Sequence, residues 1–509
     1  MPKKIIAIIV LALILRIYGI NWDQGFHLHP DERMLIMVAD NIRFPSQLNP
    51  HFFNYGSLPI YILKGVSQLI GSTGYDNMLL TGRRLSVLFD LLTVIFIYKI
   101  TTLLFRNKNI SLAAAFLYCL TFFSIQNSHF FTVDIILTCL TTVLIYALLK
   151  PRSPFIVGII FAAMLATKIT AIIFLPVVVL VLFFRKRSIL DTLYFILSSV
   201  LFFFFFMPYA FIDNREFLSQ TLQQIKMNGD PYVFPYTLQY VGTLPYWYYL
   251  KNIFLWGLGP IISILSFTGL MAVLLNCYIV IRKKHETIRQ HSNLAILLAF
   301  NLFYFIIIGH SAVKFMRYML PIYPFLTIMA GYGLYQMRKQ RILTFTFLLL
   351  PFLWTLMFMK IYTQPNTRVT ATDWILKNIP AEKTILVEYW DDQLPLSGGQ
   401  NYNIIPIDLY GQPDNQYKWS VLNDKIRRAD YIIIASNRVY VPLQKLADCS
   451  RFKECFPKTN QYYKQLFNGK LGFKKVAEFT DEPIINDQSA DESFTVYDHP
   501  KVMIFKKTS

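Results

Sequence analysis

Acidic residues are scarce in the first 360 positions of this 509-residue chain, where 12 Asp and Glu accompany 30 Lys and Arg. Charged residues make up only 16% of the sequence, hydrophobic residues make up 54%, and the mean hydropathy is +0.41. Such a composition excludes an ordinary soluble globular protein. The net charge of +19 does not indicate nucleic-acid binding, because the basic residues stand in short clusters between apolar runs, as membrane topology requires.

Cysteine is also rare, and the spacing of the five cysteines gives no sign of a metal site. Cys119, Cys139 and Cys277 lie in apolar runs, where we expect inert thiols. Cys449 and Cys455 lie in a soluble tail, and we expect them to pair if that tail faces an oxidising compartment.

Apolar runs long enough to cross a membrane recur through the first 360 residues. The first run lacks a following small-residue cleavage site, so we expect an uncleaved helix with its N-terminus inside. The stretch 154–184 is too long for one span, and Lys168 near its middle predicts two short helices that turn at the outer face. The predicted eleven spans lie at about 4–20, 86–105, 110–126, 132–149, two within 154–184, 188–207, 259–281, 292–309, 320–336 and 341–360.

Basic clusters fix the predicted orientation, because Lys and Arg accumulate on the cytoplasmic side of membrane proteins. With the spans above, every cluster falls on the inside. If 154–184 were a single helix, three clusters would face outward. The clusters are Lys3-Lys4, Arg106/Lys108, Lys150/Arg152, Arg185-Lys186-Arg187, Arg282-Lys283-Lys284 and Arg338-Lys339/Arg341.

Residues 1–360 are therefore predicted to form a polytopic α-helical membrane domain with two long outer loops, 21–85 and 208–257. From residue 361 the composition changes, and 361–509 are predicted to form an α/β domain outside the cytoplasm. We find no phosphate loop or nucleophile motif in this tail. Its predicted elements are helices at 372–379 and 420–428 and strands at 384–390, 430–435, 474–479 and 502–506.

Ionisable residues near the outer ends of the spans are the candidates for function, because charge is expensive within a membrane. They come from separate stretches of the sequence, so a bundle of spans is able to bring them into one cavity at the outer boundary. Cations there indicate a ligand with phosphate, and carboxylates indicate a base or a metal ligand. The candidates are Arg16, Asp31, Glu32, Arg33, Arg83, Arg84, Asp134, Lys168, Lys314 and Arg317.

Several candidates also have a purely structural interpretation. Arg16 is placed to extend from its helix end towards water, Asp134 to stabilise a helix N-terminus, and Lys168 to mark a turn. Lys314 and Arg317 lie three residues apart in a short predicted outer loop, so they share one helical face. Positive charge on the outside is contrary to the positive-inside bias, and this exception favours a phosphate clamp. The histidines offer no pair with strong metal spacing; the candidate ligands are His27, His29, His129 and His310.

Taken in order, these motifs resemble a known family. They are Asp31-Glu32 in a long first outer loop, Arg84-Leu85 at the second span, Asp134 after the second outer turn, Ala166-Thr167-Lys168, and Lys314 with Arg317-Tyr318 before Leu320-Pro321. The arrangement resembles the GT-C glycosyltransferases of the protein O-mannosyltransferase and ArnT-like group. The resemblance covers residues 1–360, whereas the tail differs from the β-trefoil insertion of eukaryotic protein mannosyltransferases.

The resemblance implies an inverting transfer of one sugar from a polyprenyl-phosphate donor to an acceptor outside the cytoplasm: a protein, a lipid or a glycan. Asp31 takes the role of the base, and Glu32 tunes or orients it or helps to hold a metal. The implied donor-phosphate ligands are Arg84, Lys168, Lys314 and Arg317, and further candidates are Asp134, His29, His310 and Tyr318.

The implied location is the cell membrane, with the tail outside, and the implied partners are the lipid-linked donor and membrane lipid. The resemblance makes no cofactor certain and leaves a divalent metal open, because relatives of this fold differ on it. An alternative from another class is a transporter or flippase of a lipid-linked or anionic solute. Internal repeats would favour that alternative, and we find no convincing repeat. A structural membrane protein with a partner-binding tail would leave the charges near the membrane unexplained.

Overall fold

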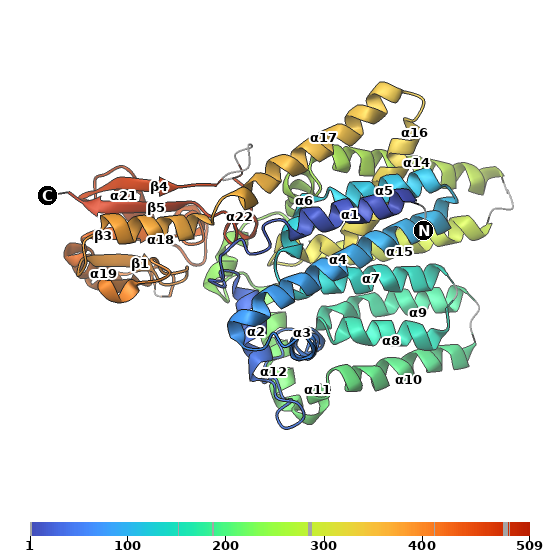
Figure 1. Cartoon of the computed structure of the whole chain (residues 1–509), viewed down its shortest axis with the longest axis horizontal. Helices are drawn as coiled ribbons and strands as arrows, with labels where there is room; N and C mark the ends of the chain where they lie inside the picture. Colours follow the sequence, from blue (N-terminus) through green and yellow to red (C-terminus); the bar gives the residue numbers. More distant parts are fainter. Residues whose placement is uncertain are drawn as a thin grey trace. The chain divides into compact units, whose positions relative to one another are not determined.

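Two structural units make up the computed structural model, which describes residues 3–150, 152–185, 188–283, 288–411, 413–481, 487 and 489–508 (Figure 1). The membrane unit comprises Met1–Ile20, His29–Ile225 and Leu244–Phe358. The second unit comprises Asn21–Leu28, Lys226–Thr243 and Met359–Ser509, so it includes parts of both predicted outer loops. Three basic residues used in the topology prediction, Lys186, Arg187 and Lys284, lie outside the described residues.

Each predicted span corresponds to helix in the structure, because the apolar runs fold as helices that satisfy their own backbone groups. The number of membrane crossings and their orientation remain predictions. The helices are α1 (Lys3–Ile17), α4 (Tyr75–Phe105), α5 (Lys108–Cys119) with α6 (Phe122–Ser128), α7 (Val133–Leu149), α8 (Pro154–Leu165), η1 (Ile169–Phe174) with α9 (Leu175–Phe184), α10 (Ile189–Phe206), α14 (Pro260–Lys283), α15 (Ile288–Gly309), η4 (Met316–Ile322) with α16 (Tyr323–Gln336), and α17 (Arg341–Met359).

Length and composition make this a multi-pass membrane protein. In the described part of the chain, five helical stretches are long and apolar enough to cross a membrane, and a sixth is added if α5 and α6, bent by 58°, count as one. The split predicted within 154–184 is confirmed, because α8 ends at Leu165 and η1 begins at Ile169.

Small residues allow the helices to approach closely. A Cβ added at Gly269 in α14 would lie 1.9 Å from the backbone oxygen of Met329 in α16, so these two helices pack with their backbones in near contact. Figure 1 shows α7, α8 and α10 in one layer, in which α8 packs against both α7 and α10, and α4 lies next to α7.

Short helices fill the two segments that were predicted to be outer loops. The second span is also longer than predicted, since α4 begins at Tyr75 rather than near 86. The helices of the membrane unit in these segments are α2 (Pro30–Asn41), α3 (Leu58–Leu69), α11 (Tyr209–Ile212), α12 (Asn214–Gly229), α13 (Trp247–Asn252) and η3 (Ile253–Gly257), and η2 (Pro235–Tyr240) belongs to the second unit.

The second unit contains a five-stranded sheet of order β2-β1-β3-β5-β4, which confirms the predicted α/β class. The first three strands are parallel, and β5 pairs antiparallel with both β3 and β4. Four of the strands are those predicted from the sequence, and β2 was not predicted. The strands are β1 (Thr384–Glu388), β2 (Asn403–Ile407), β3 (Tyr431–Ile434), β4 (Phe473–Phe479) and β5 (Val502–Lys507).

Helices cover both faces of this sheet, because alternate strand residues point to opposite sides. Ile385 and Ile433 face α18 (Thr367–Asn378), whereas Leu386 and Ile432 face the cluster that includes residues of α19 (Gln416–Arg428) and α21 (Pro457–Phe467). Cys449 and Cys455 form a disulfide. The shorter helical elements of this unit are η5 (Lys360–Thr363), η6 (Gly399–Asn401), α20 (Tyr440–Lys445) and α22 (Glu492–Thr495).

Candidate active site

Four charged side chains form a continuous chain of ion pairs in the membrane unit. Arg317 Nη2 lies 2.9 Å from Asp31 Oδ2, and Arg317 Nε lies 3.5 Å from Asp134 Oδ2. The other oxygen of Asp134, Oδ1, accepts a hydrogen bond of 2.8 Å from Lys168 Nζ. The structure thus brings together four residues from α2, η4, α7 and the α8–η1 turn, with two positive and two negative charges in alternation.

Access to this chain differs along its length. The side chain of Asp31 is 22% exposed, while those of Asp134 and Arg317 are 4% and 10% exposed. Lys168 lies over the ring of Tyr318, with Nζ 4.5 Å from the ring centre. Asp31 is therefore the carboxylate of the chain that an incoming molecule reaches first.

Glu32 occupies a different environment from its neighbour Asp31. It is fully buried, and its two oxygens accept hydrogen bonds of 3.0 Å from Arg83 Nε and 2.8 Å from Arg83 Nη2. Oε1 also accepts from the backbone N–H of Phe131 at 2.9 Å. Such a bidentate pair fixes both partners. Glu32 therefore anchors the start of α2, and Asp31 projects from that anchored turn.

The N-terminus of α2 is further fixed by local sequence. Pro30 occupies the first turn, and Nδ1 of His29 accepts a hydrogen bond from the backbone N–H of Glu32 at 3.4 Å. His29 is buried and its ring lies 4.6 Å from that of Phe130. The structure thus places His29 as a helix cap.

The remaining sequence candidates lie in varied environments. Arg84 is exposed on α4, next to the buried Arg83, because adjacent helix residues point about 100° apart. Lys314 is buried and donates to the carbonyl of Ala312 at 2.9 Å. His310 is exposed, with its ring 6.3 Å from the ring of Tyr246. Of the predicted phosphate ligands, Lys168 and Arg317 join the ion-pair chain.

A second buried charge pair was missed in the sequence. Arg16 in α1 pairs with Asp90 in α4, and Asp90 also accepts from the hydroxyl of Tyr118 at 2.6 Å. Both charged side chains are buried, so the interaction ties α1, α4 and α5 together. Asp90 is the single acid within the apolar run 86–105, and this isolated charge could have identified the pair in the sequence.

One group of side chains offers metal-ligand geometry among the described residues. The ligand atoms of His51, Asp213 and Glu216 lie within 4.8 Å of one another. His51 Nδ1 is 2.9 Å from Glu216 Oε2, and Asn49 Nδ2 donates to Asp213 Oδ2 at 2.9 Å. The group joins the segment after α2 to the start of α12, and the His51–Glu216 contact is also a hydrogen bond that needs no metal.

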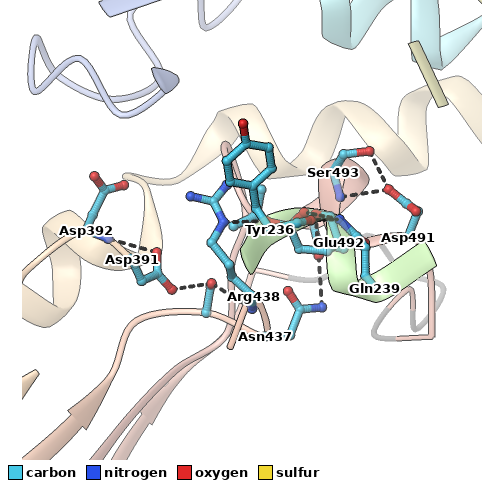
Figure 2. A network of polar contacts seen from close by, with 12 residues as sticks. Tyr236, Gln239, Asp391, Asp392, Asn437, Arg438, Asp491, Glu492 and Ser493 are labelled. Atoms are coloured by element: carbon cyan, nitrogen blue, oxygen red, sulfur yellow. Dashed lines mark hydrogen bonds and ion pairs between the residues drawn. The ribbon is translucent and has the colours of Figure 1, made fainter. Parts of the chain in front are cut away.

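The second unit carries its own polar network at the carboxyl ends of β1 and β3 (Figure 2). Arg438 Nε lies 2.6 Å from Glu492 Oε1, and Gln239 Nε2 donates to Glu492 Oε2 at 2.9 Å. Asp391 accepts from Arg368 Nη2 at 2.8 Å and from the hydroxyl of Ser436. These contacts join η2, α18, α22 and two strand ends, so the network stabilises the second unit.

A buried histidine of the second unit lies between two carboxylates. His499 Nδ1 is 2.6 Å from Asp498 Oδ1, and Nε2 is 2.8 Å from Asp487 Oδ2. Burial alone would lower the pKa of His499, but Asp498 and Asp487 outweigh it and raise the pKa to about 10. The imidazole is therefore charged at neutral pH.

This arrangement predicts that stability falls in alkaline solution. The pKa of His499 in the folded protein exceeds its ordinary value of 6.5. The pairing of His499 with the two carboxylates therefore stabilises the fold fully below pH 6.5, and this stabilisation is lost as the pH rises through about 10. Thermal unfolding of the full-length protein in detergent at pH 7 and pH 10 measures the loss. His499→Gln should show a smaller fall over the same range, and an equal fall in both proteins would contradict this role of His499.

Comparisons with known proteins agree with the expected resemblance. The dolichyl-phosphate-mannose-protein mannosyltransferase family matches residues 57–212. No curated protein sequence matches the chain significantly.

Similar solved structures extend over almost the whole chain. The oligosaccharyltransferase of Archaeoglobus fulgidus in its apo form has a TM-score of 0.54 at 12% identity, covering 99% of this chain and 88% of that one. The same protein with an inhibitory peptide and a dolichol-phosphate has a TM-score of 0.51 at 13% identity, with the same coverage. It has also been crystallised with zinc and sulfate. ArnT from Cupriavidus metallidurans bound to undecaprenyl phosphate has a TM-score of 0.46 at 12% identity, covering 98% and 97%.

The class that follows is a multi-pass membrane protein with the GT-C glycosyltransferase fold and a small C-terminal sheet domain. The predicted resemblance to GT-C glycosyltransferases is thereby confirmed. Within that class, residues 57–212 resemble the dolichyl-phosphate-mannose-protein mannosyltransferases in particular.

Proposed function

We propose that this protein is an inverting membrane glycosyltransferase that moves one sugar from a polyprenyl-phosphate donor to an acceptor hydroxyl, with Asp31 as the base. The observation that carries the proposal is the alternating chain Asp31, Arg317, Asp134 and Lys168. It unites a reachable carboxylate with two cations in one place, which are the groups that such a transfer needs. The family match over 57–212 and the GT-C fold support the same reaction class.

Asp31 accepts the proton of the acceptor hydroxyl in this mechanism. The acceptor oxygen attacks the anomeric carbon from the face opposite the phosphate, and the bond between that carbon and the phosphate oxygen breaks. Polyprenyl phosphate leaves with the bonding electrons, so the configuration at the anomeric carbon inverts. A base that lies within hydrogen-bond reach of the hydroxyl contributes about 10²- to 10⁴-fold to the rate of such a step.

Arg317 and Lys168 stabilise the phosphate as negative charge develops on it. In the structure each is paired with a carboxylate, so the donor phosphate competes with Asp31 and Asp134 for these cations. Arg317 suits a phosphate because its guanidinium donates several hydrogen bonds in one plane. An Arg317 bound to phosphate releases Asp31 for the acceptor, and the proposal therefore predicts that donor binding precedes proton transfer.

The proposed location is the cell membrane, with the C-terminal sheet domain outside the cytoplasm. The Cys449–Cys455 disulfide supports this side, because disulfides persist in oxidising compartments. A divalent metal is compatible with the proposal, and the described residues that offer such a site are His51, Asp213 and Glu216. The donor sugar is a hexose or pentose, and the acceptor is a protein, a lipid or a glycan.

The direct test is to incubate the purified full-length protein with a radiolabelled polyprenyl-phosphate sugar and candidate acceptors. We expect acceptor-dependent release of polyprenyl phosphate, with the label moved to the acceptor. Transport of the intact donor across a vesicle membrane, without cleavage of its sugar–phosphate bond, would instead support a flippase.

A further inference from the structure

The segment 53–58 docks on the turn that carries Lys168. The backbone N–H of Gly56 donates to the carbonyl of Thr167 at 3.0 Å, and that of Leu58 donates to the carbonyl of Ala166 at 3.0 Å. A Cβ at position 56 would lie 1.9 Å from the backbone oxygen of Ala166. Glycine is therefore required for this approach, and the docking fixes the segment directly beside a residue of the ion-pair chain.

The other end of the segment is fixed by α12. The backbone N–H of Phe53 donates to Gln220 Oε1 at 2.6 Å, and the Phe53 ring packs against that of Phe217 at 5.8 Å. Phe53 is buried with Ala166 in one apolar cluster. The backbone at Tyr55 is thus held between two anchored points, and the half-buried Tyr55 ring packs edge-on against that of Phe52 at 5.9 Å.

Tyr55 lies beside the ion-pair chain. Its ring packs against the apolar cluster that contains Leu35, one helical turn after Asp31, and Val133, next to Asp134. The charges of Asp31, Asp134 and Arg317 act on its phenol from this position. Burial is the largest influence and, with the two carboxylates, raises the pKa of Tyr55 well above its ordinary value. The phenol therefore stays protonated over the working range of pH and serves as a hydrogen-bond donor, not as a base.

We propose that Tyr55 is a further substrate-binding residue of this site and that its hydroxyl donates a hydrogen bond to the phosphate of the lipid-linked donor. The inference rests on the proposed function for the identity of the ligand. Arg317 and Lys168 draw the phosphate to the chain of ion pairs, and the phenol is the neutral donor that the docked segment presents at the same place. A hydrogen bond to a charged group then adds affinity for the donor.

The test compares Tyr55→Phe with the wild-type protein, both full-length and in detergent. We measure the Kd of a fluorescent short-chain polyprenyl phosphate, together with KM and kcat for sugar transfer. The loss of one hydrogen bond to a charged group predicts that Kd and donor KM rise by about 10- to 100-fold, with kcat changed little. Tyr194→Phe is the matched control, because Tyr194 is exposed on α10 and should leave both constants unchanged.

Gly56→Ala tests the docking independently. The added methyl group meets the Ala166 carbonyl, so donor Kd should rise at least as much as in Tyr55→Phe. Gly65→Ala in α3 is the control, because a Cβ there meets nothing within 4 Å.

An unchanged Kd in Tyr55→Phe would overturn the proposal, as would a raised KM with an unchanged Kd, which would place the phenol at the sugar. Failure of the proposed function is distinguishable, because it appears as absent transfer in the wild type. The Kd comparison remains decisive for Tyr55 in that case.

Discussion

Asp31→Asn is expected to lower the rate of sugar transfer by about 10²- to 10⁴-fold, because the amide retains the shape of the carboxylate but does not accept the proton. Asp31 is the most exposed carboxylate of the ion-pair chain, so its replacement should disturb the fold little. The measurement is kcat for acceptor-dependent release of polyprenyl phosphate, together with Kd for polyprenyl phosphate. We expect the Kd to stay within a few-fold of the wild-type value.

Asp40→Asn provides the matched control within the same helix. Asp40 lies near the end of α2, away from the N-terminal turn, and should support wild-type transfer. Near-normal turnover by Asp31→Asn would remove Asp31 from the role of base. Equal loss in both variants would show that α2 tolerates no change of charge, which would also contradict the assignment.

Arg317→Lys should have the second largest effect, a fall in kcat/KM for the donor of about 10²-fold. The guanidinium reaches Asp31 and Asp134 from two different nitrogens, whereas a lysine ammonium offers one compact charge on a flexible stem. The substitution keeps the net charge, so the loss reports on geometry. Steady-state kinetics at varied donor concentration measures it.

Arg338→Lys is the comparison for this variant. Arg338 is exposed and its guanidinium lies over the ring of Tyr335, 4.2 Å from the ring centre, outside the ion-pair chain. We expect the Arg338→Lys variant to transfer sugar at the wild-type rate. If Arg317→Lys also kept the wild-type kcat/KM, the phosphate would have to be bound elsewhere.

Helix positions and the meeting of distant charges were predictable because both follow from the cost of burying polar groups in a membrane. Apolar length between basic clusters located the helices, and the break at Lys168 followed from the excess length of 154–184. The scarcity of charge near the spans singled out Asp31, Asp134, Lys168 and Arg317, which the structure brings together.

Pairings between particular residues were not predictable. Nothing local distinguishes Arg83 from Arg84, yet packing buries the first against Glu32 and leaves the second exposed. Tyr55 was hidden for the same reason, since the charged groups that act on its phenol come from α2, α7 and η4. The strand β2 was missed because Asn403–Ile407 is short and carries a proline, a pattern typical of a sheet edge.

The ion pair between Arg16 and Asp90 has a consequence for biosynthesis. The two residues are 74 positions apart, so Arg16 is made before its partner exists. At about 5–20 residues per second, Asp90 follows after roughly 4–15 s. During this interval α1 holds an uncompensated charge, which disfavours its release into lipid. We therefore expect α1 to remain at the translocon until α4 arrives, and the two helices to leave it as a pair.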